Sequence, residues 1–244
     1  MRELMISYIA VIGLMLGSFF NVYVYRTLNN LQWYKGKSRC DNCKHELGVL
    51  DLIPLISFIY LRGKCRYCGN KIGYNHIISE VLFLIGFTTL AIFEPLDLTS
   101  CIAYVVLITI GINVISDIIE RVTLTNTIYL GGFIVVILKI ITNLTLVGWL
   151  PCLVYVVLVA FCCVILHFIS NLMQKVMGGG DFDILLLFFA YGGIQCMLDS
   201  LFLGSFIGTL VLLPLLVTGK VNRKTELPFV PILYIGFLIH IIIR

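Results

Sequence analysis

Charged residues are scarce in this sequence. Its 17 basic and 13 acidic side chains make up 12% of 244 residues, whereas 60% of the residues are hydrophobic. A soluble domain has about 25% charged residues. So little charge cannot cover a globule in water, which excludes a soluble enzyme, a disordered chain, a collagen-like fibre and a disulfide-rich secreted domain. A multi-pass membrane protein remains.

Long apolar runs account for most of the chain. A membrane-spanning helix needs roughly 20 mostly apolar residues, and the runs are too long and too little alternating for barrel strands. The first run also lacks a cleavage site and is too long for a signal peptide, so we expect it to remain as a helix. We therefore predict an all-α polytopic fold of about eight transmembrane helices. The expected spans are residues 4–25, 77–94, 100–117, 124–142, 147–170, 184–199, 200–218 and 228–243.

One segment, residues 26–76, is polar and carries nine of the 17 basic residues. We expect three parts: a first helix (1–25), a small cytoplasmic zinc-binding domain (26–76) and a seven-helix membrane domain (77–244). Lysine and arginine favour cytoplasmic loops. An N-terminus outside the cell places 14 of them inside and three outside, so the net charge of +4 reflects membrane topology and not nucleic-acid binding.

Four of the nine cysteines form two CxxC pairs, Cys40 with Cys43 and Cys65 with Cys68. Two such pairs have the spacing of a structural zinc site with four thiolate ligands. Neighbouring basic residues favour the thiolate form, and a segment of this size needs a metal to fold. Two disulfides are disfavoured in a reducing cytosol, while an iron centre or a redox pair remains an alternative.

Two aspartates are candidate catalytic residues. The predicted topology places Asp117, at the end of the third span, and Asp181, at the start of the sixth, at the same cytoplasmic face; Asp199 lies at the other face. Two nearby carboxyls share one proton, so that one can act as base on water and the other as acid on a carbonyl. The glycines 178–180 allow close approach of a substrate. Loop-end carboxylates and a proton-coupled transporter remain alternatives.

These residues together resemble the type IV prepilin peptidases, a family of GxGD-type intramembrane aspartyl proteases. The resemblance extends to about residue 190 and involves the following segments: GSFFNV at 17–22 with Arg26, the two CxxC pairs, IPLIS at 53–57, LRG at 61–63, Tyr74, Glu80, Asp117 and GGGD at 178–181.

The resemblance implies an aspartic endopeptidase in a bacterial plasma membrane. Such enzymes remove the short basic leader from type IV prepilins and pseudopilins at the cytoplasmic face, cutting after a glycine. Many also methylate the new N-terminus with S-adenosylmethionine. The substrates serve type IV pili, type II secretion or DNA uptake. Asp117 and Asp181 take the catalytic positions, and Cys40, Cys43, Cys65 and Cys68 the zinc positions.

The sequence departs from the family pattern in three places. Asp183 replaces a lysine, residues 123–126 lack a proline, and Asp41 replaces a proline in the first CxxC pair. Glu80, one turn into the second span, is a candidate for orienting the substrate amine during methylation; the alternative is an ion pair with Arg26. A carboxylate-gated transporter with a zinc knuckle and a membrane anchor with a zinc-binding domain are the competing functions.

Overall fold

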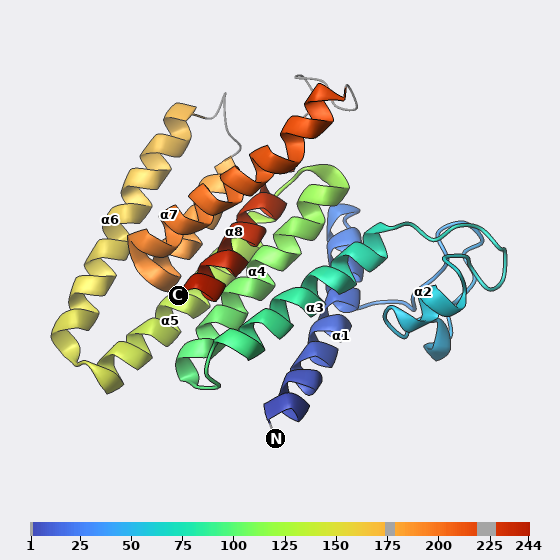
Figure 1. Ribbon diagram of the computed structural model, residues 1–244, viewed down its shortest axis with the longest axis horizontal. Helices are drawn as coiled ribbons and strands as arrows, with labels where there is room; N and C mark the ends of the chain where they lie inside the picture. The colour runs from blue at the N-terminus through green and yellow to red at the C-terminus, as the bar shows by residue number, and fades with distance from the viewer. Residues whose placement is uncertain (1, 174–178, 219–227) are drawn as a thin grey trace. The chain divides into compact units, whose positions relative to one another are not determined.

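The computed structural model describes residues 2–173, 179–218 and 228–244 (Figure 1). Within these ranges the regular structure is helical, apart from two isolated β-bridges. The chain divides into two compact units, Met1–Ala91 and Ile92–Arg244. Each unit is described by itself below.

Within the residues that the structure describes, six helices are long and apolar enough to cross a membrane. They are α1 (Arg2–Leu28), α3 (Asn75–Phe93), α4 (Leu98–Glu120), α5 (Thr125–Leu146), α6 (Trp149–Met173) and α7 (Gly179–Val217). The apolar helix α8 (Val230–Ile243) is shorter. The protein is therefore an all-helical, multi-pass membrane protein. The predicted count of eight spans is roughly matched, because the bent α7 covers most of two predicted spans, 184–199 and 200–218, and α8 covers most of the last one.

The bend in α7 lies at Gly193, whose backbone has φ 71° and ψ −164°. This φ is open to glycine and strained for other residues. The predicted break between the spans 184–199 and 200–218 lies six residues later, at Asp199. That position is wrong: Asp199 continues the second arm of the helix. The charged side chain of Asp199 does not interrupt the helix, whereas the backbone conformation of Gly193 does.

In the first unit, α1 and α3 pack closely through small residues on one face of α1. A Cβ at Gly17 would lie 2.6 Å from the Ser79 carbonyl oxygen, and one at Gly13 would lie 2.8 Å from that of Phe83. One turn further, the Asn21 amide donates to the Ser79 hydroxyl at 2.9 Å. The i, i+4 spacing of these three residues puts them on one face, and glycine permits the close contact.

The polar segment of the first unit has little regular structure beyond a 3-10 turn, η1 (Val49–Asp51), and a short helix, α2 (Ile56–Tyr60). Arg26, in the last turns of α1, fixes the start of this segment. Its guanidinium donates to the carbonyl oxygens of Trp33, Lys35 and Gly36 at 2.9–3.0 Å. This basic residue therefore organises the chain that leaves the first span.

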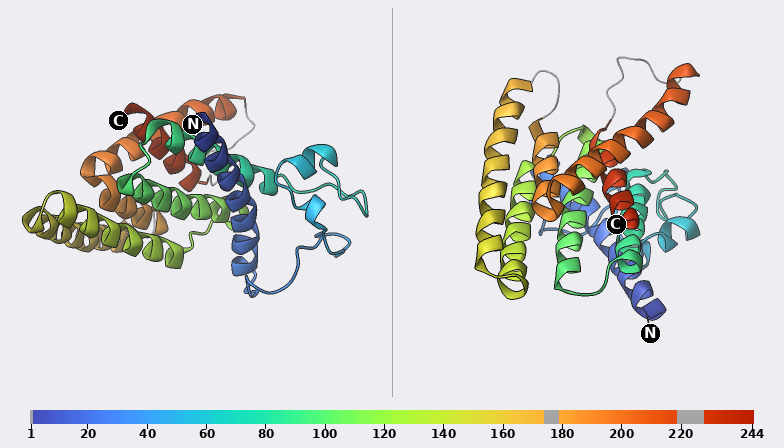
Figure 2. Two further views of the ribbon diagram at one scale, coloured as in Figure 1. Left: turned by 90° about the horizontal axis from the view of Figure 1, so that it is seen from below. Right: turned by 60° about the vertical axis from the view of Figure 1, so that its left-hand side comes forward.

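In the second unit, α8 lies between α4 and α7, and α6 lies outside against α5 and α7 (Figures 1 and 2). Most of α8 is buried, and the rings of Phe188 and Phe237 stack between α7 and α8 at 5.3 Å. Because α8 runs alongside both α4 and α7, its first residues can reach the side chains near the end of α4.

Candidate functional site

Asp117 is buried near the end of α4, with 7% of the residue exposed. Its carboxylate accepts a hydrogen bond of 3.0 Å from the backbone N–H of Val230, the first residue of α8. The first N–H groups of a helix have no partner within the helix and carry partial positive charge. The start of α8 therefore orients the Asp117 carboxyl.

Asp181 lies in the first turn of α7, and its carboxyl is near enough to Asp117 for their charges to interact. The start of α7 thus lies near the end of α4, whereas the catalytic role of the two aspartates stays a prediction. Gly180, which precedes Asp181, allows α7 to lie close to the turn that follows α4, because a Cβ at this position would overlap the side chain of Thr123. The rest of the glycine motif, at Gly178, lies outside the described residues.

Thr123 is held in place by two polar residues of α4. The Asn113 side chain accepts from the N–H of Leu124 and donates to the Thr127 hydroxyl, at 2.8 and 3.0 Å. The Ser116 hydroxyl donates to the Val122 carbonyl at 2.6 Å. Both residues are fully buried. They therefore fix the turn between α4 and α5.

The sequence alone predicts no role for Asn113, Ser116 or Val230. Asn113 and Ser116 could have been found, because buried polar residues in an apolar run need partners. Val230 could not, because its contribution is a backbone N–H that any residue except proline supplies.

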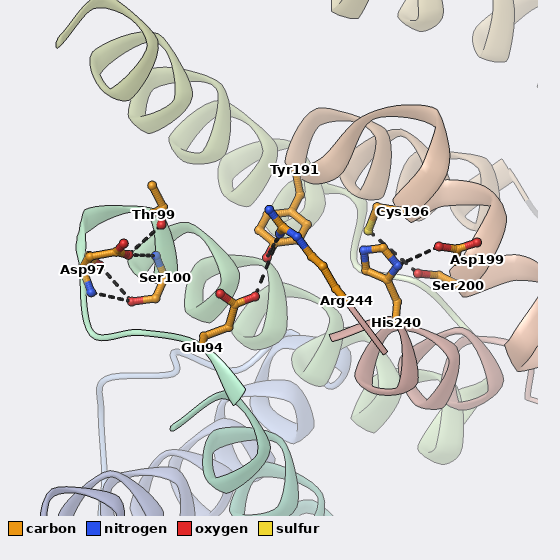
Figure 3. Close-up of polar contacts among 10 residues, drawn as sticks. All are labelled: Glu94, Asp97, Thr99, Ser100, Tyr191, Cys196, Asp199, Ser200, His240 and Arg244. Atoms are coloured by element: carbon orange, nitrogen blue, oxygen red, sulfur yellow. Dashed lines mark hydrogen bonds and ion pairs between the residues drawn. The ribbon is translucent and has the colours of Figure 1, made fainter. Parts of the chain in front are cut away.

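The other acidic residues of α7 point elsewhere. Asp183 interacts with the Tyr129 hydroxyl of α5. Asp199 pairs with His240 at 2.9 Å (Figure 3). His240 is ten residues along α8 from Val230, about 15 Å at 1.5 Å per residue. As predicted from topology, Asp199 is thus well separated from Asp117.

Cys40, Cys43, Cys65 and Cys68 form one cluster. Their four sulfur atoms lie within 4.8 Å of one another. The sulfurs of Cys40 and Cys68 are 3.9 Å apart, close to the edge of about 3.8 Å expected for a tetrahedron with Zn–S bonds of about 2.3 Å. Four thiol ligands at this separation fit a zinc ion, so the cluster could bind zinc as predicted.

The two knuckles have the same backbone geometry. In each, the first cysteine carbonyl accepts from the N–H four residues on, at Lys44 and Gly69, and both of these have positive φ. The N–H of Asn70 is the main cause that lowers the pKa of Cys68 to about 6. The pKa of Cys43 is raised to about 11, because desolvation and neighbouring thiols outweigh the N–H of His45. Four thiols without a metal thus share protons unequally, and binding zinc would release the remaining ones.

We expect about one zinc per chain, and Cys65→Ser should reduce the metal content to near zero, because structural sites of this kind use all four ligands. Without metal, amide exchange in residues 39–71 should accelerate, since metal binding and folding are coupled. The purified protein would be analysed by plasma mass spectrometry, with Cys101→Ser as the matched control outside the cluster. Wild-type protein that contains neither zinc nor iron would contradict the prediction.

Glu80 is buried in α3 and accepts the backbone N–H of Leu55 at 2.8 Å. Within the described residues it forms no ion pair with Arg26, whose guanidinium binds backbone carbonyls instead. The alternative of a Glu80–Arg26 pair is therefore wrong. The contact with Leu55 ties the start of α2 to α3, and a part in methylation stays a prediction.

The sequence was compared with protein families and with proteins of known name. The family described as "Bacterial Peptidase A24 N-terminal domain" matches residues 11–93. Two relatives named prepilin leader peptidase/N-methyltransferase align along nearly the whole chain. The Bacillus subtilis protein is 23% identical over 96% of this chain and 93% of its own length. The Pseudomonas putida protein is 27% identical over 95% and 88%.

A third relative of the same name, from Vibrio cholerae, is 37% identical over 31% of this chain and 33% of its own length. No solved structure matches the chain significantly. The two long alignments span the four clustered cysteines, Asp117 and Asp181. Residues 11–93 thus match the Bacterial Peptidase A24 N-terminal domain, and the chain is similar along nearly its whole length to proteins named prepilin leader peptidase/N-methyltransferase.

Proposed function

We propose that the protein is an intramembrane aspartyl endopeptidase that removes the leader from type IV prepilins or pseudopilins, with Asp117 and Asp181 as the catalytic pair. The observation that carries the proposal is the close approach of the start of α7 to the end of α4. Gly180, next to Asp181, lies against Thr123, six residues after Asp117, and the two carboxyls interact electrostatically. The names of the relatives support the substrate class. The alternative of an ordinary loop-end carboxylate is disfavoured for Asp117, because this residue is buried.

The geometry supports a division of roles within the pair. Asp117, which accepts the N–H of Val230, is the ionised member and takes a proton from the attacking water. Asp181 holds the shared proton and donates it to the carbonyl oxygen of the scissile bond. The water oxygen bonds to the carbonyl carbon, and the C–N bond then breaks as the leaving amine takes up a proton.

The proposed orientation places the N-terminus outside, and the zinc-binding segment 26–76 and both aspartates at the cytoplasmic face. The orientation is predicted from the excess of lysine and arginine on the cytoplasmic side. Four of these basic residues lie outside the described residues: Lys175, Lys220, Arg223 and Lys224. A basic leader would then be cut where the hydrophobic segment of the prepilin enters the membrane, after a glycine. This matches the depth of Asp117 near the end of its span.

We also propose N-methylation of the new N-terminus, on the names of the relatives. S-adenosylmethionine would supply the methyl group. The described residues contain no strand followed by a glycine-rich loop of the Rossmann type, so no binding site for this cofactor follows from their arrangement. The proposal for methylation therefore includes no step at a cofactor site.

The proposed function is tested by incubating the protein in membranes with a prepilin that carries its leader. Mass spectrometry of the product reports both loss of the leader and addition of one methyl group. We expect cleavage directly after a glycine. An intact prepilin, with protein that retains its zinc and its helical content, would refute the peptidase.

Glu80→Gln should reduce methylation more than cleavage. Glutamine keeps an oxygen that can accept the Leu55 N–H, so the fold is retained while the negative charge that would hold the substrate amine is lost. Glu80→Ala, which removes both, is the comparison. Both activities are measured on one prepilin by mass spectrometry. Equal loss of the two activities in Glu80→Gln would indicate a purely structural residue.

A further inference from the structure

The surface formed by η1 and α2 is unusually apolar for a polar segment. Ile56, Ile59 and Tyr60 are 65%, 73% and 78% exposed, and their i, i+3, i+4 spacing puts them on one face of α2. Val49, in the adjacent η1, is 83% exposed. We call Val49, Leu50, Ile56, Ile59 and Tyr60 the apolar face. Such a surface, outside any span, usually marks an interaction site.

The apolar face is held by an ordered framework. On the other side of α2, the Phe58 ring lies against the backbone of Gly63. The Asp51 carboxylate, at the end of η1, pairs with Arg66 at 2.8 Å and accepts from Gly48 N–H at 3.1 Å. Arg66 belongs to the second zinc knuckle, so the apolar face is anchored to the metal cluster.

The depth of α2 is set by a membrane-spanning helix. Leu55, which immediately precedes α2, donates its N–H to Glu80. Glu80 is five residues into α3, about 8 Å along its axis. Since α3 has 19 residues, about the number needed to cross the hydrocarbon core, the start of α2 lies at the level of the lipid headgroups or slightly below.

The charge of the segment fits the same location. Residues 29–74 contain eight lysines and arginines and three acidic residues. A zinc ion held by four thiolates would add two negative charges, which leaves the segment with an excess of three positive charges. Arg62 and Lys64, directly after α2, are exposed. Basic residues beside exposed apolar ones favour binding to an anionic bilayer surface.

We propose that the apolar face inserts into the headgroup region of the anionic bilayer that α1 and α3 span, so that the zinc-binding segment rests on the membrane. The proposal requires no catalytic activity and stands apart from the proposed function. Lipid is the partner of the apolar face, because both ends of the segment emerge from membrane spans and its excess charge is positive.

The test is quenching of a single tryptophan by brominated phospholipids. Ile59→Trp is made in full-length protein in which Trp33 and Trp149 are replaced by phenylalanine, and reconstituted in nanodiscs with or without phosphatidylglycerol. Asn70→Trp, at an exposed position of the second knuckle, is the matched control. Zinc content verifies that each variant is folded.

We expect bromolipid to quench Ile59→Trp strongly and Asn70→Trp weakly, with more quenching of Ile59→Trp in anionic nanodiscs. Amide exchange of residues 49–62 should likewise be slower with phosphatidylglycerol. Equal quenching at both positions would overturn the proposal. So would an unquenched Ile59→Trp, whether its emission shows water around it or shielding by protein, since the latter would mean that another part of the chain covers the face.

Discussion

Asp117→Asn and Asp181→Asn are each expected to abolish prepilin cleavage while the protein still inserts and binds zinc. General acid–base catalysis contributes about 10²–10⁴-fold, and an amide can neither take up the proton of water nor return one to the carbonyl oxygen. Asparagine is nearly isosteric, so the N–H of Val230 keeps an acceptor in Asp117→Asn. The rate of leader removal in membranes, followed by mass spectrometry, measures the effect.

Two matched controls separate the catalytic pair from other acids of the same helix. Asp183→Asn alters a residue two positions from Asp181 that interacts with Tyr129 instead, and should keep much of the activity. Asp199→Asn alters an acid paired with His240 near the far end of α8, and should also cleave. Substantial activity in either catalytic variant, or Asp183→Asn as inactive as Asp181→Asn, would reject the assignment.

The elements of the fold that could be predicted from sequence are those set by local composition. Apolar runs gave the helices, and the spacing of Cys40, Cys43, Cys65 and Cys68 gave the cluster, which the structure confirms. Hydropathy could not locate the bend in α7, because the break depends on the φ angle of one glycine, Gly193, whereas the charge of Asp199 is accommodated by His240.

The contacts that support the site depend on residues far apart in sequence. The bond from Val230 to Asp117 joins positions 113 residues apart, and the bond from Leu55 to Glu80 joins two elements of which one is a five-residue helix. Both donors are backbone N–H groups, which carry no sequence signal. Periodicity shows which face of a helix is apolar, but it does not show which helix covers that face.

Gly180→Ala should lower the cleavage rate by about 10²-fold. A Cβ at this position would overlap Thr123, so α7 must move away from the turn between α4 and α5. Overpacking of this kind costs about 1–3 kcal/mol. Asp181, the next residue, would move with it, and a displacement of about 1 Å can cost about 10²-fold in rate. Zinc content and thermal unfolding would show that the variant is folded.

The overlap can be relieved from the other side, which makes the prediction specific. Thr123→Gly removes the atoms that a Cβ at Gly180 would meet, so the double variant should recover part of the activity lost in Gly180→Ala. Such non-additivity is expected of residues in contact. Gly132→Ala is the matched control, because its nearest neighbour would be the Leu187 side chain at 4.0 Å, an ordinary contact. If Gly180→Ala cleaves as fast as Gly132→Ala, the close approach of α7 to Thr123 does not position Asp181.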